Sequence, residues 1–526
     1  MTDRPNILFI MSDDHASNAI SAYSSRLAKD APTPNIDRIA KNGMRLNNCH
    51  CTNAICTPSR AVILTGQHSH INGVKTLDDK LPDSAILLPE ILKQNGYQTA
   101  LFGKWHLHST PRGFDDWAIL PGQGFYNDPV FNYSNESFIK PHSTPMDLET
   151  LRKSDERIKQ DPDLELGPIA KSSGYVTDII TDMTLDWLKN ECNENDPFYL
   201  CCHHKAPHDF YEYEQKYESL FEDVRFEEPE TLFEDDHTLN EISRKFGSTV
   251  SERWEPRNMV KHLMDENYPN GGKIDFSGLD ANGKTKKAYQ KYMQDYLRTV
   301  KSVDVNVGRL LDYIEASGLK KNTIIIYTSD QGMMLGEHDK IDKRWIFDES
   351  QRMPFLVQYP KEIKAGTINE DIVDNTDFTP TLLDYAGIEK PDFMQGRSFR
   401  NILQSNTPNE WRQSVYYRYW MHMAHHWVPA HYGIRTDRFK LIFFYGMKLD
   451  SKGCNHPDCD APFEPGFEMY DVQEDPFEKN NLFYNDDYKS IRDQLKSALL
   501  NLKSEVRDKD EYYPKLLALQ QEMFAD

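Results

Sequence analysis

Acidic and amide side chains follow directly after two strand-like runs of this 526-residue chain. Asp13 and Asp14 follow an apolar run near the start, and Asp330 and Gln331 follow the β-branched run 323–328. Two parallel strands of one sheet would bring these groups together at its carboxyl edge. Three carboxylates and an amide oxygen suit a hard divalent cation such as Ca²⁺ or Mg²⁺. For either pair alone, a helix cap or a turn is the alternative.

A short cysteine pattern lies between these two pairs. Cys56 is followed by Pro58 and Arg60, ahead of the apolar run 61–64. Pro58 suits the first turn of a helix. On these residues alone, Cys56 is either a buried small hydrophobe with Arg60 as a solvated charge, or a catalytic residue.

The composition indicates a soluble globular chain, with 38% hydrophobic and 27% charged residues and no apolar run of transmembrane length. The formal net charge of −22 argues against nucleic acid as a partner, because phosphate binding needs a basic face. An anion site in this chain therefore has to be a local positive pocket inside an acidic shell.

Strand-like and helical runs alternate along the first two-thirds of the chain. The predicted strands are 6–11, 97–102, 197–202 and 323–328, and the predicted helices are 33–43, 174–190 and 289–314. This alternation predicts an α/β fold with a large, mostly parallel sheet sandwiched by helices. Functional groups in such sheets gather at the carboxyl ends of the strands.

Two segments depart from the alternation. Residues 210–286 are rich in acidic and aromatic side chains with weak periodicity, which indicates an insertion over the site. Strand-like runs and a closing helix follow residue 400, at 414–420, 431–436, 439–444 and 487–506. We expect a catalytic domain over residues 1–400 and a smaller C-terminal α+β subdomain with an antiparallel sheet over 401–526, which contributes to the substrate pocket.

Further short motifs follow the cysteine pattern. They are Gly103-Lys104-Trp105-His106, Lys205-Ala206-Pro207-His208, Ser329-Asp330-Gln331-Gly332, and Gly336-Glu337-His338 followed by Lys343. A single lysine or histidine on a loop is usually just solvated. Their joint order with Asp13-Asp14 and the Cys56 pattern spans nearly the whole chain. It resembles the type I, formylglycine-dependent sulfatases of the alkaline phosphatase superfamily.

The resemblance implies a sulfuric ester hydrolase in which Cys56 is oxidised to formylglycine by a formylglycine-generating enzyme. The hydrate of that aldehyde is then the nucleophile. The resemblance also implies a divalent cation, calcium or alternatively magnesium, bound by the formylglycine and by Asp13, Asp14, Asp330 and Gln331. The family usually has Asn, sometimes His, where this chain has Gln331, which keeps the amide oxygen on a longer arm.

The same resemblance assigns roles to the remaining motif residues. Arg60 and the cation orient the hydrate, whose attack on sulfur forms a sulfo-enzyme intermediate. His208 protonates the departing alcohol oxygen, and His106 helps to deprotonate the second hydroxyl, which expels sulfate. Three lysines bind and neutralise the sulfate: Lys104, Lys205 and Lys343.

Aromatic, His and Arg residues concentrate in segment 416–436. The segment is either packed core of the C-terminal sheet or a sugar-binding wall with His431 and Arg435 as polar contacts. Together, residues 13–16, the Cys56 pattern and residues 431–436 resemble bacterial N-acetylglucosamine-6-sulfatase-like and polysaccharide sulfatases. This resemblance implies a sulfated saccharide substrate of unspecified sugar and position. The alternatives are a phosphonate monoester or phosphodiester hydrolase of the same superfamily, and a sugar-binding protein without activity. The sequence leaves the oligomeric state open.

Cysteine usage and the N-terminal residues bear on the compartment. Cys454 and Cys459 bracket a short loop and would form a local disulfide in an oxidising compartment, or, with His456, an incomplete zinc site. The first residues lack the basic, apolar and small-residue pattern of a signal peptide. From the sequence as given, we therefore expect a cytoplasmic protein. If a signal peptide was removed from it, we expect a periplasmic or secreted protein.

Overall fold

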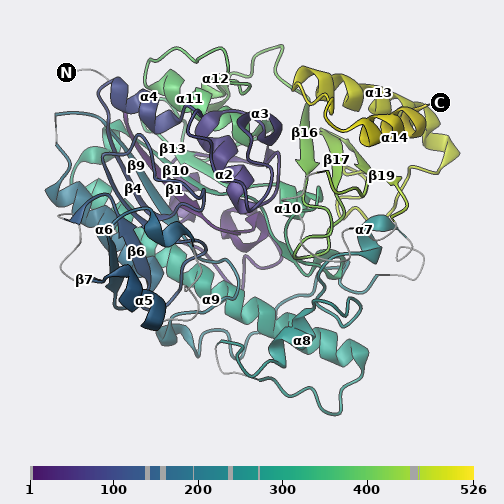
Figure 1. The fold of residues 1–526 in the computed structure, drawn as a ribbon, viewed down its shortest axis with the longest axis horizontal. Coiled ribbons are helices and arrows are strands. Elements are labelled where there is room, and N and C mark those ends of the chain that lie inside the picture. The colour runs from purple at the N-terminus through teal and green to yellow at the C-terminus, as the bar shows by residue number, and fades with distance from the viewer. Residues whose placement is uncertain are drawn as a thin grey trace.

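The computed structural model describes residues 4–136, 143–154, 162–193, 195–234, 241–269, 273–449, 460 and 463–525. An eleven-stranded sheet occupies the larger part of the molecule, and a four-stranded sheet lies toward the C-terminal side (Figure 1). Among the described helices, none combines the length and the apolar character needed to cross a membrane. The expected Cys454–Cys459 disulfide falls outside the described residues.

The large sheet is parallel at its centre. Its strand order is β14-β2-β13-β10-β1-β9-β4-β5-β6-β8-β7. The strands are β1 (Asn6–Ser12), β2 (Met44–Leu46), β4 (Gln98–Lys104), β5 (Asp116–Leu120), β6 (Val130–Tyr133), β7 (Ser143–Pro145), β8 (Ile169–Ser172), β9 (Phe198–His204), β10 (Thr323–Ser329), β13 (Phe355–Gln358) and β14 (Thr367–Asn369). The pairs from β10 through β1, β9 and β4 to β5 are parallel, and antiparallel pairs flank them. The predicted mostly parallel sheet is thereby confirmed, and the four predicted strands form its centre.

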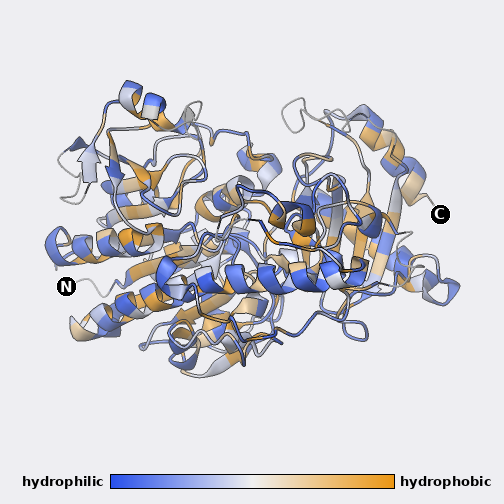
Figure 2. Ribbon diagram, turned by 90° about the horizontal axis from the view of Figure 1, so that it is seen from below, coloured by the Kyte–Doolittle hydropathy of each residue, from blue (hydrophilic) through white to orange (hydrophobic). Residues whose placement is uncertain are grey.

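Helices cover both faces of this sheet, as predicted. Alternate residues of β1 point to opposite sides: Phe9 joins one apolar core and Ile10 the other. Helices α2 (Cys56–Thr65), α4 (Leu88–Gln94) and α11 (Phe378–Tyr385) pack in the first core. Helices α6 (Val176–Asn190) and α9 (Ala281–Ala316) pack in the second. Figure 2 shows the hydrophobic residues gathered in the strands and on the helix faces turned toward them.

The remaining helices are short or lie at the C-terminus. They are α1 (Asp37–Lys41), α3 (Ser69–Asn72), α5 (Leu148–Ser154), α7 (Ile242–Lys245), α8 (Met259–Leu263), α10 (Asp348–Gln351), α12 (Arg400–Leu403), α13 (Lys489–Glu505) and α14 (Pro514–Phe524). The helix predicted over 33–43 is therefore shorter than expected. Its first residues form a turn instead, in which the backbone N–H groups of Asn35 and Ile36 donate to the buried carboxylate of Asp304.

The C-terminal sheet is antiparallel, with strands β16 (Ser414–Tyr419), β17 (His431–Thr436), β18 (Phe439–Phe444) and β19 (Gly466–Asp471). Helices α13 and α14 cover one face of it. Its other face, with Tyr417, Ile442 and Phe444, belongs to the same apolar core as α2 and β1. The predicted antiparallel sheet is confirmed, whereas β19 and α14 were not predicted.

Candidate active site

The strand register brings the sequence motifs to one edge of the large sheet. Ser12, the last residue of β1, pairs with Ser329 of β10 on one side and with His204 of β9 on the other. Gly103 of β4 pairs with His203 of β9. The residues that follow these four strands therefore meet at their carboxyl ends.

Cys56 is the first residue of α2 and faces this edge. Its Sγ lies 3.4 Å from Oδ1 of Asp13. Burial, and then the Asp13 carboxylate, raise the pKa of the Cys56 thiol, so it stays protonated. A protonated thiol is a poor nucleophile. The environment therefore does not suit a thiolate mechanism, although the residue sits at the centre of the site.

Arg60 lies one turn further along α2 and is buried, which excludes the solvated-charge alternative. Its Nε donates to Oδ2 of Asp330 at 3.0 Å, and its Nη1 donates to the carbonyl of Lys104 at 2.7 Å. Its Nη2 lies 3.6 Å from Oδ2 of Asp13. The guanidinium thus ties the helix that carries Cys56 to the ends of three strands, β1, β4 and β10.

Three buried carboxylates converge beside Cys56. Asp13, Asp14 and Asp330 each offer an oxygen within 4.8 Å of the others. Burial, and then Asp13, raise the pKa of Asp330 to about 7, which shows how unfavourable three adjacent negative charges are without a compensating cation. Oε1 of Gln331 is buried and lacks a hydrogen-bond partner among the described residues, while its Nε2 donates to Asp14. Three carboxylates and a spare amide oxygen fit a hard divalent cation such as Ca²⁺ or Mg²⁺.

Of the three lysines named by the sequence motifs, Lys104 and Lys343 contact this cluster. Nζ of Lys104 contacts Asp13 and donates to Gln123, and Nζ of Lys343 contacts Oδ2 of Asp14 at 2.6 Å. Although burial opposes ionisation of Asp13, Lys104, His208, Arg60 and Lys343 together hold its pKa well below the ordinary value. Lys205 lies over the ring of Tyr126, 4.8 Å from its centroid.

The two motif histidines flank Cys56. Nε2 of His208 lies 3.7 Å from Oδ2 of Asp14, and Nδ1 of His106 lies 3.4 Å from Oγ1 of Thr57. Burial, and then Lys104, lower the pKa of His106 well below the ordinary value, so its imidazole is neutral at physiological pH. A neutral imidazole is able to accept a proton.

A pocket of about 430 Å³ opens over Cys56. Lys205, His208 and Lys343 line it, as the sequence motifs led us to expect. Its wall also holds charged and polar residues that were not predicted, namely Gln123, Asp209, Glu212, Arg257, Asp342, Arg344, His425 and His426. Asp342 and Arg344 flank the Lys343 motif, and the adjacent His425 and His426 are a visible sequence signal. Arg257, within the expected insertion, carries no local signal at all.

His431 and Arg435 do not belong to this pocket. The His431 ring stacks on Trp345 and Tyr417 in the protein core. Arg435 is buried and pairs with Asp348 at 3.0 Å. On strand β17 these two residues share the face that packs toward the large sheet, so the structure does not place them for the predicted sugar contact.

Replacing Arg435 with glutamine is therefore expected to affect stability rather than catalysis. The change leaves Asp348 with Lys440, at 2.8 Å, as its remaining cationic partner, and we expect the free energy of unfolding to fall by about 3 kcal/mol. Denaturant unfolding measures the loss, and kcat/KM per folded molecule should be unchanged. A raised KM without loss of stability would instead indicate that Arg435 contacts the substrate.

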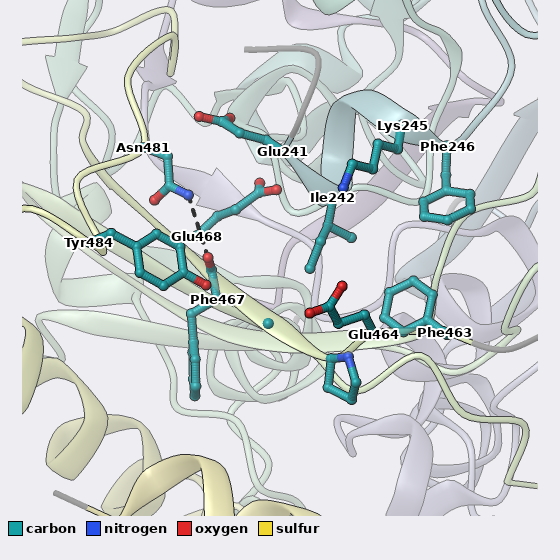
Figure 3. A pocket seen from close by; sticks show the side chains of 12 residues that line it. Glu241, Ile242, Lys245, Phe246, Phe463, Glu464, Phe467, Glu468, Asn481 and Tyr484 are labelled. Carbon is teal, nitrogen blue, oxygen red and sulfur yellow. Dashed lines mark hydrogen bonds between the residues drawn. The ribbon is translucent and has the colours of Figure 1, made fainter. Parts of the chain in front are cut away.

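A second pocket, also about 430 Å³, lies between the 241–246 segment and strand β19 (Figure 3). Phe246, Phe463 and Tyr484 form part of its wall. Among the described residues that line it, the carboxylates are those of Glu241, Glu464 and Glu468, and the one cationic residue is Lys245. Burial, and then Glu468, raise the pKa of Glu241 to about 7. An excess of carboxylates repels an anionic ester, so this pocket does not suit a sulfated substrate.

Two family models match the chain. The sulfatase model matches residues 5–388, and the model of the C-terminal region of N-sulphoglucosamine sulphohydrolase matches residues 336–505. An N-acetylglucosamine-6-O-sulfatase of Bacteroides thetaiotaomicron is 38% identical over 97% of this chain and 88% of its own length.

Solved structures agree with this match. The structure of BT4656 in complex with its substrate D-glucosamine-2-N,6-O-disulfate has a TM-score of 0.81 and 36% identity, covering 96% of this chain and 99% of that one. The phosphonate monoester hydrolase of Agrobacterium radiobacter has a TM-score of 0.68 at 19% identity, covering 96% of each chain, which shows a shared fold alone. The chain thus belongs to the sulfatase family, within the alkaline phosphatase superfamily, and is a sulfuric ester hydrolase.

Proposed function

We propose that this sulfatase removes the 6-O-sulfate of a glucosamine-type sugar, with a formylglycine at position 56 and Ca²⁺ as the cation. The observation that carries the proposal is the pocket over Cys56, whose cations Lys205, Arg257, Lys343 and Arg344 outnumber the carboxylates Asp209, Glu212 and Asp342 in a chain of net charge −22. The relative that is 38% identical is an N-acetylglucosamine-6-O-sulfatase, and BT4656, at 36% identity, has D-glucosamine-2-N,6-O-disulfate as its substrate. Both support the proposed sugar and the proposed position of the sulfate.

The cation and the formylglycine fit the residues present. Asp13, Asp14, Asp330 and Gln331 would hold the cation, which supplies charge neutralisation for the sulfate oxygens and for the nucleophile. The formylglycine supplies a hydroxyl nucleophile where the buried thiol cannot serve. Mg²⁺ remains the alternative ion, and metal analysis of the purified protein decides between the two.

The side chains of this protein bind the sulfate, position residue 56 and transfer the protons. Lys104, Lys205 and Lys343 bind the sulfate oxygens and stabilise their charge as the ester bond breaks. Arg60 holds α2 in register with Asp330, which fixes the position of residue 56. His208 carries the proton for the departing sugar oxygen, and neutral His106 accepts a proton from residue 56.

Sulfate release from a panel of sulfated sugars tests the proposal. The sugars are 6-O-sulfated N-acetylglucosamine, its 3-O-sulfated isomer and 6-O-sulfated galactose, and the enzyme is co-produced with a formylglycine-generating enzyme. Hydrolysis of phenyl phosphonate is measured alongside as release of phenol. We expect the 6-O-sulfated glucosamine derivative to have the highest kcat/KM. Preference for another sugar refutes the substrate assignment, and preference for the phosphonate favours the alternative hydrolase.

Activity should fall at alkaline pH because of Lys205. Burial, and then Lys104, lower the pKa of Lys205 to about 8, so its ammonium is charged below this pH and neutral above it. The neutral amine no longer attracts sulfate, and log kcat/KM should fall above pH 8 with a limiting slope of about −1. Lys205→Arg keeps its charge and should flatten this alkaline limb. An unchanged limb in that variant would assign the titration to another group.

A further inference from the structure

One carboxylate of the pocket wall lies directly against the ring of His208. Oδ1 of Asp209 and the backbone carbonyl of the same residue each lie 2.8 Å from Nδ1 of His208. This Nδ1 is therefore the donor, and Nε2 points the other way, to within 3.7 Å of Asp14 at the sheet edge. Among other histidines near Cys56, His106 has a hydroxyl and His203 a carbonyl as ring partner, and Nδ1 of His426 lies 3.4 Å from a carboxylate oxygen of Asp342, farther than the 2.8 Å of the His208 contact.

An arginine from a distant segment fixes that carboxylate. Nη2 of Arg257 lies 3.2 Å from Oδ2 of Asp209, so the two oxygens of Asp209 serve His208 and Arg257 separately. Although burial opposes ionisation of Asp209, these two neighbours hold its pKa well below the ordinary value. The carboxylate thus remains an acceptor throughout the working pH range.

The loop that carries Arg257 is itself anchored beside the active site. The carbonyl of Arg257 accepts from the backbone N–H of Thr249, and Asn258 caps helix α8 through the backbone N–H of Lys261. Thr249 forms a bridge to Lys340, and Val250 N–H donates to the carbonyl of Asp339. The backbone at Arg257 is therefore anchored to residues 339 and 340, which shortly precede Lys343.

We propose that Asp209 and Arg257 are positioning residues for the departing-group acid, Asp209 orienting the His208 imidazole and Arg257 orienting Asp209. The inference rests on the proposed role of His208. As the S–O bond breaks, its electron pair stays on the sugar oxygen, which takes the proton from Nε2 of His208. Asp209 accepts no proton and only keeps Nδ1–H directed toward itself. The 6-O-sulfate of a sugar needs this help, because an alkoxide is a poor leaving group.

A series of aryl sulfates, from 4-nitrophenyl to phenyl sulfate, tests the proposal without reference to the sugar. Nitrophenolate leaves readily without a proton, whereas phenolate depends more on the acid. In Asp209→Asn, kcat/KM for phenyl sulfate should fall about 10- to 100-fold more than that for 4-nitrophenyl sulfate. Arg257→Gln should show a smaller selective loss, and Arg257→Lys should recover part of it. The exposed Glu255→Gln, in the same loop, is the matched control and should behave as the wild type.

The double variant with His208→Ala separates positioning from general damage. If Asp209 acts through His208, its substitution adds no further selective loss in the His208→Ala background. Equal losses across the aryl series, or a selective loss that persists without His208, would overturn the positioning role. If His208→Ala lowers kcat/KM more for phenyl sulfate than for 4-nitrophenyl sulfate and Asp209→Asn does not, only the positioning role of Asp209 is refuted. If His208→Ala shows no selectivity, the proposed acid fails and this inference with it.

Discussion

Sulfate release by a Cys56→Ala variant is expected to fall by a factor on the order of 10⁴ to 10⁶, since the residue that becomes the nucleophile is gone while the cationic pocket remains. The fold should survive. Alanine removes one buried Sγ from the first turn of α2, and the remaining nine residues of that helix keep their packing. We expect the free energy of unfolding to change by about 1 kcal/mol. Initial rates and denaturant unfolding on the same preparation measure both quantities.

Two observations would contradict this expectation. One is a Cys56→Ala enzyme that retains a sizeable fraction of wild-type kcat, which would remove residue 56 from the chemistry. The other is an equal loss in Cys192→Ala, which would point to general damage. Cys192 is a suitable control because it is partly exposed and lies beside Gln98, at the start of β4 and away from the carboxyl ends of the strands. Retained binding of a sulfate ester to Cys56→Ala would show that the lysines bind the substrate independently of the nucleophile.

Replacing Asp330 with asparagine is expected to remove the bound cation and to lower kcat/KM on the order of 10³-fold. Asparagine keeps the shape of the side chain but removes one of three carboxylates, and it leaves Arg60 without its 3.0 Å ionic partner. Loss of the cation removes several kcal/mol of charge stabilisation at the sulfate. Metal content measured by mass spectrometry and initial rates of sulfate release test the two parts.

Thermal unfolding gives an independent readout of the same site. Because a cation binds the folded protein alone, a chelator should lower the Tm of the wild type and leave the Tm of Asp330→Asn unchanged. Without metal, the variant should be at least as stable as the wild type, because asparagine removes a carboxylate that burial, and then Asp13, disfavour by raising the pKa of Asp330 to about 7. Asp312→Asn, at an exposed helix position, is the matched control and should keep the chelator response. Full metal content in Asp330→Asn would rule out the assigned ligand set.

The site residues that sequence analysis identified share one property: each lies in a short motif tied to the end of a buried strand or to the start of α2. Strands such as 6–11 and 323–328 are continuous apolar runs, and the parallel register then places Asp13 and Asp330 side by side. That step also needs β1 and β10 to be neighbours in the sheet, which the structure shows and the alternation of strands and helices does not determine.

The pocket wall could not be predicted in the same way. Arg257 reaches Asp209 across 48 positions of sequence, from a segment with weak periodicity. His431 and Arg435 were predicted as sugar contacts because aromatic segments suit both a sugar wall and a packed core. Which of the two applies depends on which face of β17 packs toward the large sheet, and that is a property of the tertiary fold.

The most direct test of the account compares conversion of Cys56 with activity. Preparations made with increasing amounts of a formylglycine-generating enzyme are digested, and the mass of the peptide containing residue 56 gives the fraction in which CH₂SH has become CHO. Sulfate release from 6-O-sulfated N-acetylglucosamine is measured on the same preparations. We expect the rate of sulfate release to be proportional to that fraction, so that a plot of rate against fraction passes through the origin. Full activity in unconverted protein, or complete conversion without sulfate release, would contradict it.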